Sequence, residues 1–159
     1  MKKFAVALND FQASQLSVLV IKNINEWMKK NYLCDIIGFY NNCTNFVIEP
    51  NFCCMPSSEL WGYDGIVIAT DFNSAEIVLR SPSISRKYFY IWDLEWFRLK
   101  EKDFLRLSNV YKNQELEVIT RNQEYAQVIE KVWGRKVKFK NEYFDINYLM
   151  RIINDSCIN

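Results

Sequence analysis

The strongest constraint on the fold is residues 65–70 (GIVIAT), a continuous run of mostly β-branched and apolar residues that Asp71 closes. An unbroken run of this kind, in place of an alternation of apolar and polar residues, is typical of a strand covered on both faces. Parallel sheets contain such strands because the helices that connect them pack on both faces. The run therefore predicts the central strand of a parallel sheet.

Further strand-like runs alternate with amphipathic segments along the chain. The runs are residues 4–8, 35–40, 45–49, 87–92, 117–120 and 136–139, whereas residues 51–63 are expected to be irregular. Apolar residues with helical spacing occupy residues 16–30 after Ser14 as N-cap, 74–79, 104–110, and 125–133 before Gly134 as C-cap. Strands separated by helices form βαβ units with right-handed crossovers. We expect a three-layer α/β/α Rossmann-like sandwich with a mainly parallel sheet of about six or seven strands.

Length and composition favour one domain over residues 1–159, because 159 residues is an ordinary domain size and half of them are apolar. The formal net charge of +1 lacks the excess of positive charge that nucleic-acid binding requires. No apolar run approaches the roughly 20 residues that span a bilayer. The apolar stretch after Lys3 is also too short for a signal peptide. We therefore expect a cytoplasmic protein with no nucleic-acid partner and no membrane span.

The chain contains no histidine, which excludes Ser-His-Asp and Cys-His catalysis within it. Its cysteines lack Cys-x-x-Cys spacing and are expected to be buried free thiols, with no metal site: Cys34, Cys43, Cys53, Cys54 and Cys157. No P-loop motif occurs, and residues 9–14 after the first strand contain no glycine, unlike a dinucleotide fingerprint. We expect no cofactor.

Ligands of open parallel sheets bind beyond the carboxyl ends of the strands, where loops and helix N-termini converge. The segments at those ends are residues 9–11, 71–73, 93–95, 121–122 and 141–142. From these segments and the neighbouring Trp96, the candidate site residues are Asn9, Asp10, Phe11, Asp71, Asp93, Glu95, Trp96, Arg121 and Asn122.

Two alternatives stay open for the acids among them. Asp71 precedes a predicted helix, so it either caps that helix or contacts a hydroxylated ligand. Asp93 and Glu95 would share one face of an extended chain, and such a pair either serves as general base and hydroxyl ligand or forms a solvated turn. The neighbouring Trp92 is expected in the core, and Trp96 is a candidate for stacking on a sugar.

Residues 55–71 read M-P-S-S-E-L-W-G-Y-D-G-I-V-I-A-T-D, and residues 87–96 read K-Y-F-Y-I-W-D-L-E-W. Together with 116–122 (L-E-V-I-T-R-N) and 136–139 (K-V-K-F), they resemble the N-terminal domains of GT-B glycosyltransferase-like proteins of tailed phages and bacteria. The resemblance covers most of residues 1–150. It implies the acceptor-side half of a metal-independent glycosyltransferase that transfers a hexosyl group from a nucleotide sugar.

The resemblance also implies partners. A carbohydrate acceptor would bind the cleft, with Asp93 or Glu95 as the base and Asp10, Asp71 and Arg121 lining it. The C-terminal donor-binding domain is missing from residues 1–159, so a separate nucleotide-sugar-binding domain, or a homo-oligomer, would complete the enzyme. The alternative is a non-enzymatic binding or protein-interaction module that kept the fold. A phosphoacceptor receiver is a third reading, although Arg121 stands where that family needs lysine.

Overall fold

The computed structural model describes residues 3–11, 14–31, 35–42, 46–98 and 100–155. Its centre is a seven-stranded sheet in which every pairing is parallel, in the order β3-β2-β1-β4-β5-β6-β7. The strands are β1 (Phe4–Asp10), β2 (Ile36–Asn42), β3 (Cys53–Pro56), β4 (Ile66–Ala69), β5 (Arg86–Ile91), β6 (Leu116–Thr120) and β7 (Phe139–Lys140). The predicted Rossmann-like sandwich is confirmed.

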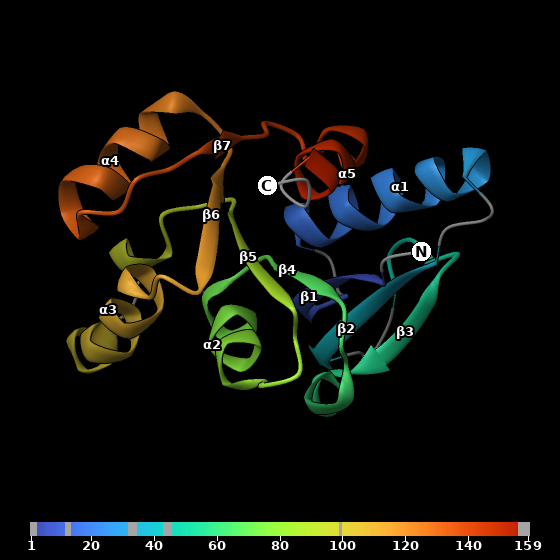
Figure 1. The fold of residues 1–159 in the computed structure, drawn as a ribbon, viewed down its shortest axis with the longest axis horizontal. Helices are drawn as coiled ribbons and strands as arrows, with labels where there is room; N and C mark the ends of the chain where they lie inside the picture. The colour runs from blue at the N-terminus through green and yellow to red at the C-terminus, as the bar shows by residue number, and fades with distance from the viewer. Residues whose placement is uncertain (1–2, 12–13, 32–34, 43–45, 99, 156–159) are drawn as a thin grey trace.

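The helices form two layers, one on each face of the sheet (Figure 1). On one face, α1 (Gln15–Lys30) lies beside α5 (Ile146–Asp155). On the other face lie α2 (Phe72–Arg80), α3 (Phe104–Lys112) and α4 (Gln123–Trp133). The described residues also form three short 3-10 helices: η1 (Ser57–Gly62), η2 (Glu95–Phe97) and η3 (Glu101–Asp103). None of the helices in the described part of the chain is long and apolar enough to span a membrane.

The path of the chain through the sheet reverses once. From β1 the chain moves outward through β2 to β3, returns to β4 on the other side of β1, and then moves outward to β7. At this reversal α1, which follows β1, packs on one face of the sheet, and α2, which follows β4, packs on the other face. The loops after β1 and β4 therefore diverge. A crevice at the carboxyl ends of these two strands follows from the topology.

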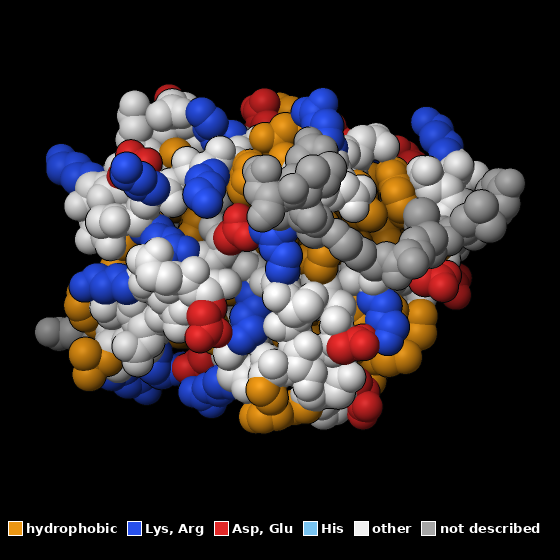
Figure 2. All heavy atoms as spheres, in the orientation of Figure 1, with side chains coloured by type: hydrophobic (Ala, Val, Ile, Leu, Met, Phe, Trp, Pro, Cys, Tyr) orange, Lys and Arg blue, Asp and Glu red, His pale blue; other side chains and the backbone are white. Residues whose placement is uncertain are grey.

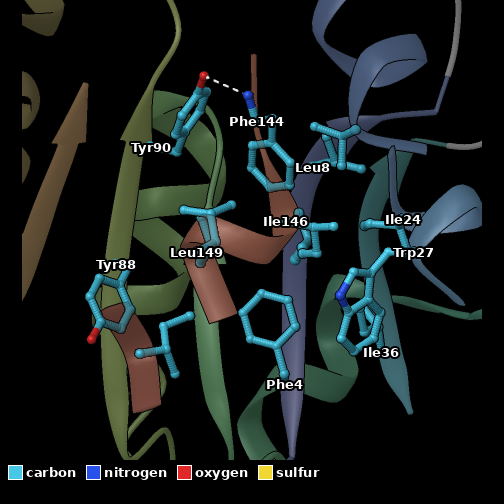
Figure 3. Close-up of a cluster of buried hydrophobic side chains, with 14 of the residues drawn as sticks. Phe4, Leu8, Ile24, Trp27, Ile36, Tyr88, Tyr90, Phe144, Ile146 and Leu149 are labelled. Atoms are coloured by element: carbon cyan, nitrogen blue, oxygen red, sulfur yellow. Dashed lines mark hydrogen bonds between the residues drawn. The ribbon is translucent and has the colours of Figure 1, made fainter. Parts of the chain in front are cut away.

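The core between the sheet and the α1–α5 layer is built from apolar residues of β1, β2, β4 and β5 (Figure 3). The ring of Phe144, which precedes α5, meets Tyr90 of β5 edge-on, with 5.0 Å between centroids. The Tyr90 hydroxyl donates to the Asn141 carbonyl at 2.7 Å and accepts from the Phe144 N–H at 3.3 Å. These contacts fasten α5 to the sheet.

The opposite layer is held by stacked aromatic rings. Tyr111 of α3 lies parallel to Trp133 of α4 with centroids 5.2 Å apart, and Trp96 meets both rings edge-on. On the surface seen in Figure 2, acidic and basic side chains are interspersed, with basic side chains more frequent over the α4 side.

Two of the predicted helix caps, at the start of α1 and the end of α4, are confirmed. The Ser14 hydroxyl accepts the Ser17 N–H at 3.0 Å and caps α1. Gly134 ends α4 in the left-handed conformation, with φ of 65°.

The edges of the sheet differ from the sequence prediction. The predicted strand at residues 45–49 is wrong, because residues 46–49 form no strand. Residue 45 lies outside the described part. Instead the Asn25 amide of α1 holds this region, since it donates to the Glu49 carbonyl and accepts the Asn51 N–H. Residues 51–63 are not irregular, because they contain β3 and η1. The strand at 136–139 is reduced to Phe139–Lys140, and α5 was not predicted.

The prediction of buried thiols is wrong for both described cysteines. Cys53 is exposed and Cys54 partly buried, because β3 is an edge strand. Cys34, Cys43 and Cys157 lie outside the described residues.

Candidate functional site

A cleft of about 390 Å³ opens at the carboxyl ends of β1, β4 and β5, at the reversal in strand order. Parallel α/β sheets bind ligands at this position because two diverging loops leave room there. Side chains from the three strand ends and from the starts of α1 and α2 line the cleft: Leu8, Asn9, Asp10, Ser14, Gln15, Leu16, Ser17, Thr70, Asp71, Asn73, Trp92, Asp93, Glu95 and Arg98.

Asp71 joins the two central strand ends to α2. Its Oδ1 accepts the Ser74 N–H at 3.0 Å, and its Oδ2 accepts the Ser74 hydroxyl at 2.8 Å. The same Oδ2 accepts the Asn9 N–H from the end of β1 at 2.9 Å. Burial raises the pKa of Asp71, although these hydrogen bonds oppose the shift. The predicted capping role is therefore confirmed, and the carboxylate still lines the cleft.

Glu95 is held against the start of α2 by its carboxylate. Both oxygens accept the Phe72 N–H, each at 3.2 Å, and this N–H is one of the helix-terminal donors without a partner inside the helix. Burial, followed by repulsion from the Asp71 charge, raises the pKa of Glu95 to about 7. The Phe72 hydrogen bond and Arg98 act in the opposite direction but do not cancel burial. Glu95 therefore exchanges a proton near neutral pH, as a general base must.

Asp93 and Arg98 form the outer rim beside Glu95. One Asp93 oxygen accepts the Leu94 N–H at 2.8 Å, and the other is ion-paired with the Arg98 guanidinium. Both side chains are substantially exposed, at 44% for Asp93 and 67% for Arg98, so this pair contributes little to stability. The chain is not extended between Asp93 and Glu95, since η2 starts at Glu95, yet both carboxylates line the cleft.

Trp92 lies in the cleft wall with Arg121 behind it. The Arg121 guanidinium carbon lies 3.9 Å from the centroid of the Trp92 ring, within cation–π distance. Trp92 is only partly buried and packs against the α1–α5 core, so the prediction of a core position is only half right. It supplies an aromatic surface in a cleft whose other lining residues are mostly polar in type.

The structure brings five of the predicted residues together as cleft lining: Asn9, Asp10, Asp71, Asp93 and Glu95.

The remaining four predicted residues lie outside the lining. Phe11 is fully buried against Tyr40, because the chain turns inward after β1. Trp96 packs in the aromatic layer, Asn122 caps α4 through the Tyr125 N–H, and Arg121 lies behind Trp92.

Several lining residues were not predicted. Ser14 and Ser17 reach the cleft because α1 starts there, and the Ser17 hydroxyl donates to the Asp10 carbonyl at 2.7 Å. Arg98 enters from the turn after η2, whereas Asn73, in the first turn of α2, belongs to one of the strand-end segments that the sequence indicates. Their common signal is their position just inside a helix or turn that follows a strand end.

Two alternatives can be compared with this geometry. Among the described residues, no group of three or more His, Cys, Asp or Glu side chains is arranged to hold a metal ion. Receiver-type domains have the strand order 2-1-3-4-5, whereas here β2 and β3 both lie on the same side of β1. The topology therefore contradicts the phosphoacceptor reading.

No protein-family model, no curated protein and no solved structure matches the chain. The function of the cleft must therefore be inferred from its own residues.

Proposed function

We propose that this chain is the acceptor-side domain of a glycosyltransferase-like protein, whose cleft binds a hydroxyl-rich acceptor and presents it to Glu95. The observation that carries the proposal is the position of Glu95, a carboxylate with a pKa of about 7 beside a second acid at the reversal in strand order. The resemblance of residues 55–71 and 87–96 to GT-B N-terminal domains agrees with this role.

The charge of the lining favours a neutral, hydroxylated ligand over a nucleotide. Carboxylates dominate it, and its single arginine, Arg98, is already paired with Asp93. Phosphate groups would be repelled there, whereas hydroxyl groups can donate to carboxylates and exchange hydrogen bonds with the amides of Asn9 and Asn73. Trp92 offers an apolar surface for the carbon face of a sugar ring.

The proposed reaction is one displacement. The acceptor hydroxyl loses its proton to the Glu95 carboxylate as its oxygen forms a bond to the anomeric carbon of the donor sugar. The bond from that carbon to the nucleotide diphosphate breaks, and the diphosphate leaves with the electron pair. A separate nucleotide-sugar-binding domain supplies the donor and stabilises the leaving group, so the described cleft needs only the acceptor and the base.

Binding of the acceptor can be tested without the donor domain. We expect a panel of mono- and oligosaccharides, added to ¹⁵N-labelled protein, to shift amide signals of Asn9, Asp71 and Asn73 and the indole signal of Trp92. Trp92→Ala should weaken this binding about tenfold, since loss of a stacking contact is worth about 1 kcal/mol or more. Trp61→Ala is the matched control, because Trp61 is 56% exposed and lies outside the cleft lining. If no sugar shifts any cleft signal, the proposal fails.

The role of Glu95 can be separated from acceptor binding. With a partner donor domain present, Glu95→Gln should lower kcat about 10²- to 10⁴-fold, the usual contribution of a general base, while acceptor binding changes little. Activity that survives this substitution would remove Glu95 from the mechanism.

A second candidate function is self-association, which an exposed apolar patch favours. Phe97 is 72%, Phe104 55% and Leu105 76% exposed, and the first two contact the aromatic layer at Trp96 and Trp133. Contiguous exposed apolar groups of this kind mark interfaces.

Sedimentation measurements test this second function. Wild-type protein should form dimers as its concentration rises, and Leu105→Asp should shift it to monomer. Val47→Asp, at another exposed apolar position (58%), should leave the dimer intact. A wild-type protein that stays monomeric throughout would exclude self-association.

A further inference from the structure

A second pocket of about 370 Å³ lies beside the outer strands β6 and β7, where β6 begins and residues 134–138 connect α4 to β7. Its lining consists of Gln114, Glu117, Val118, Gly134, Arg135, Lys136, Lys138 and Phe139. None of these residues lines the cleft, so the two pockets are separate.

The pocket exists because β7 pairs with only part of β6. Phe139 and Lys140 pair with Ile119 and Thr120, while the first half of β6, which pairs with β5 on its inner side, has no strand on its outer side among the described residues. There the Arg135 guanidinium donates to the Leu116 carbonyl in place of a backbone partner. The Val137 N–H donates to the Glu130 carboxylate of α4 at 3.4 Å. The connecting segment therefore stands off from the sheet edge and leaves a gap.

Arg135 is the unusual group in this gap. Its side chain is buried, with the residue 7% exposed, and its Nη1 has no hydrogen-bond partner among the described residues. A buried donor without a partner is unfavourable, and more so when it belongs to a charged group. Burial lowers the pKa of Arg135, and the charge of Glu117 only partly opposes this shift. The Nη1 group thus lacks an acceptor, and the guanidinium as a whole lacks a full counter-charge.

The other charged side chains of the lining increase this excess of positive charge. Lys136 and Lys138 line the same pocket and are exposed. The one lining carboxylate, Glu117, is already ion-paired with Arg86 from β5. A small anion in the pocket would supply the counter-charge that the buried Arg135 lacks and would accept hydrogen bonds from the two lysines.

We propose that this pocket binds a small anion carrying a phosphate or carboxylate group, held between Arg135, Lys136 and Lys138. Val118 and Phe139 form the apolar wall against which the remainder of such a ligand would pack. The opposite charge of the two pockets separates their ligands, because the acidic cleft disfavours the anions that this pocket attracts. The inference does not depend on the function proposed for the cleft.

The test is a titration of ¹⁵N-labelled full chain with inorganic phosphate and, separately, with acetate and citrate, at constant ionic strength. Shifts should concentrate at Glu117, Gly134 and Lys136, and leave Asn9 and Asp71 of the cleft unchanged. Stronger shifts with phosphate than with citrate identify a phosphate site, and the reverse order identifies a carboxylate site. If none of the three anions shows saturable binding at these residues, the proposal is overturned.

Variants distinguish a site from general attraction to positive charge. Lys136→Ala combined with Lys138→Ala should raise the Kd at least about tenfold, whereas Lys22→Ala combined with Lys29→Ala removes the same charge from α1 and should change it less than twofold. Equal effects of the two pairs would reduce the binding to non-specific attraction and overturn the proposal. Arg135→Lys keeps the charge but loses the planar fork, so it should weaken binding while thermal unfolding confirms that the variant is folded.

Discussion

Replacement of Phe144 by alanine is expected to lower the free energy of unfolding by about 3 to 5 kcal/mol, the usual cost of deleting a buried phenylalanine ring. The ring is fully buried, and it packs edge-on against Tyr90 in the core that joins α5 to the sheet. Its loss leaves a cavity that this closely packed layer cannot fill. Thermal or urea unfolding measures the effect, which corresponds to a fall in Tm of roughly 6 to 20 °C for a domain of this size.

The preceding residue provides the control. The Tyr143 side chain is 60% exposed, so Tyr143→Ala should change the free energy of unfolding by less than about 0.5 kcal/mol. Hydrogen exchange adds a local readout, because amides of α5 should lose protection in Phe144→Ala before those of β1 and β4. Equal stability of the two variants would show that Phe144 is not part of the core.

The second large effect concerns pH. Because the pKa of Glu95 is raised in the folded protein to about 7, the folded state binds more protons than the unfolded state between pH 4.5 and pH 7. The stabilisation from the neutral carboxyl is complete below pH 4.5 and is lost as pH rises through 7. Relative to Glu95→Gln, which stays neutral, wild type should lose about 2 to 3 kcal/mol of unfolding free energy between pH 4.5 and pH 8.5.

Urea unfolding of both proteins across this pH range measures the difference. Glu124→Gln, which removes an exposed carboxyl from α4, should follow the wild-type pH dependence. A constant difference in stability between wild type and Glu95→Gln at every pH would mean that the Glu95 carboxyl ionises as it does in water. Its proposed role as a proton acceptor near neutral pH would then be untenable.

The central part of the fold was predictable because its strands are covered on both faces. Ile66–Ala69 and Arg86–Ile91 lie inside the sheet, and burial on two faces leaves an apolar run that needs no knowledge of neighbouring strands. The caps Ser14 and Gly134 were equally predictable, because a helix end is a local structure.

The sheet edges were not predictable from local pattern. Cys53–Pro56 carries no strand pattern, and it is a strand only because the buried β2 lies beside it. Residues 46–49 have such a pattern but form no strand, and the Glu49 carbonyl instead accepts a hydrogen bond from the side chain of Asn25, which is distant in sequence. The helix α5 carries a local signal in the sequence. Asp145 accepts the Asn147 and Tyr148 N–H groups at its start, and Ile146, Leu149 and Ile153 follow with helical spacing.

The candidate site was partly predictable from the order of strands and helices. The rule for strand ends located the acids Asp71, Asp93 and Glu95, since it depends on topology alone. The same rule could not show that Phe11 turns into the core. Nor could it show that Glu95 accepts the Phe72 N–H, because that contact requires β4 and β5 to be neighbours and a 3-10 turn after Asp93.

Titration of the Glu95 side-chain carboxyl by ¹³C NMR tests the proposed role of the cleft most directly, with Glu95→Gln to assign the signal. We predict a midpoint near pH 7, set by burial and by the charge of Asp71. We also predict that Asp71→Asn, which removes that charge, lowers this midpoint. A midpoint near 4.3, the value of a glutamate in water, would contradict the assignment of Glu95 as the base.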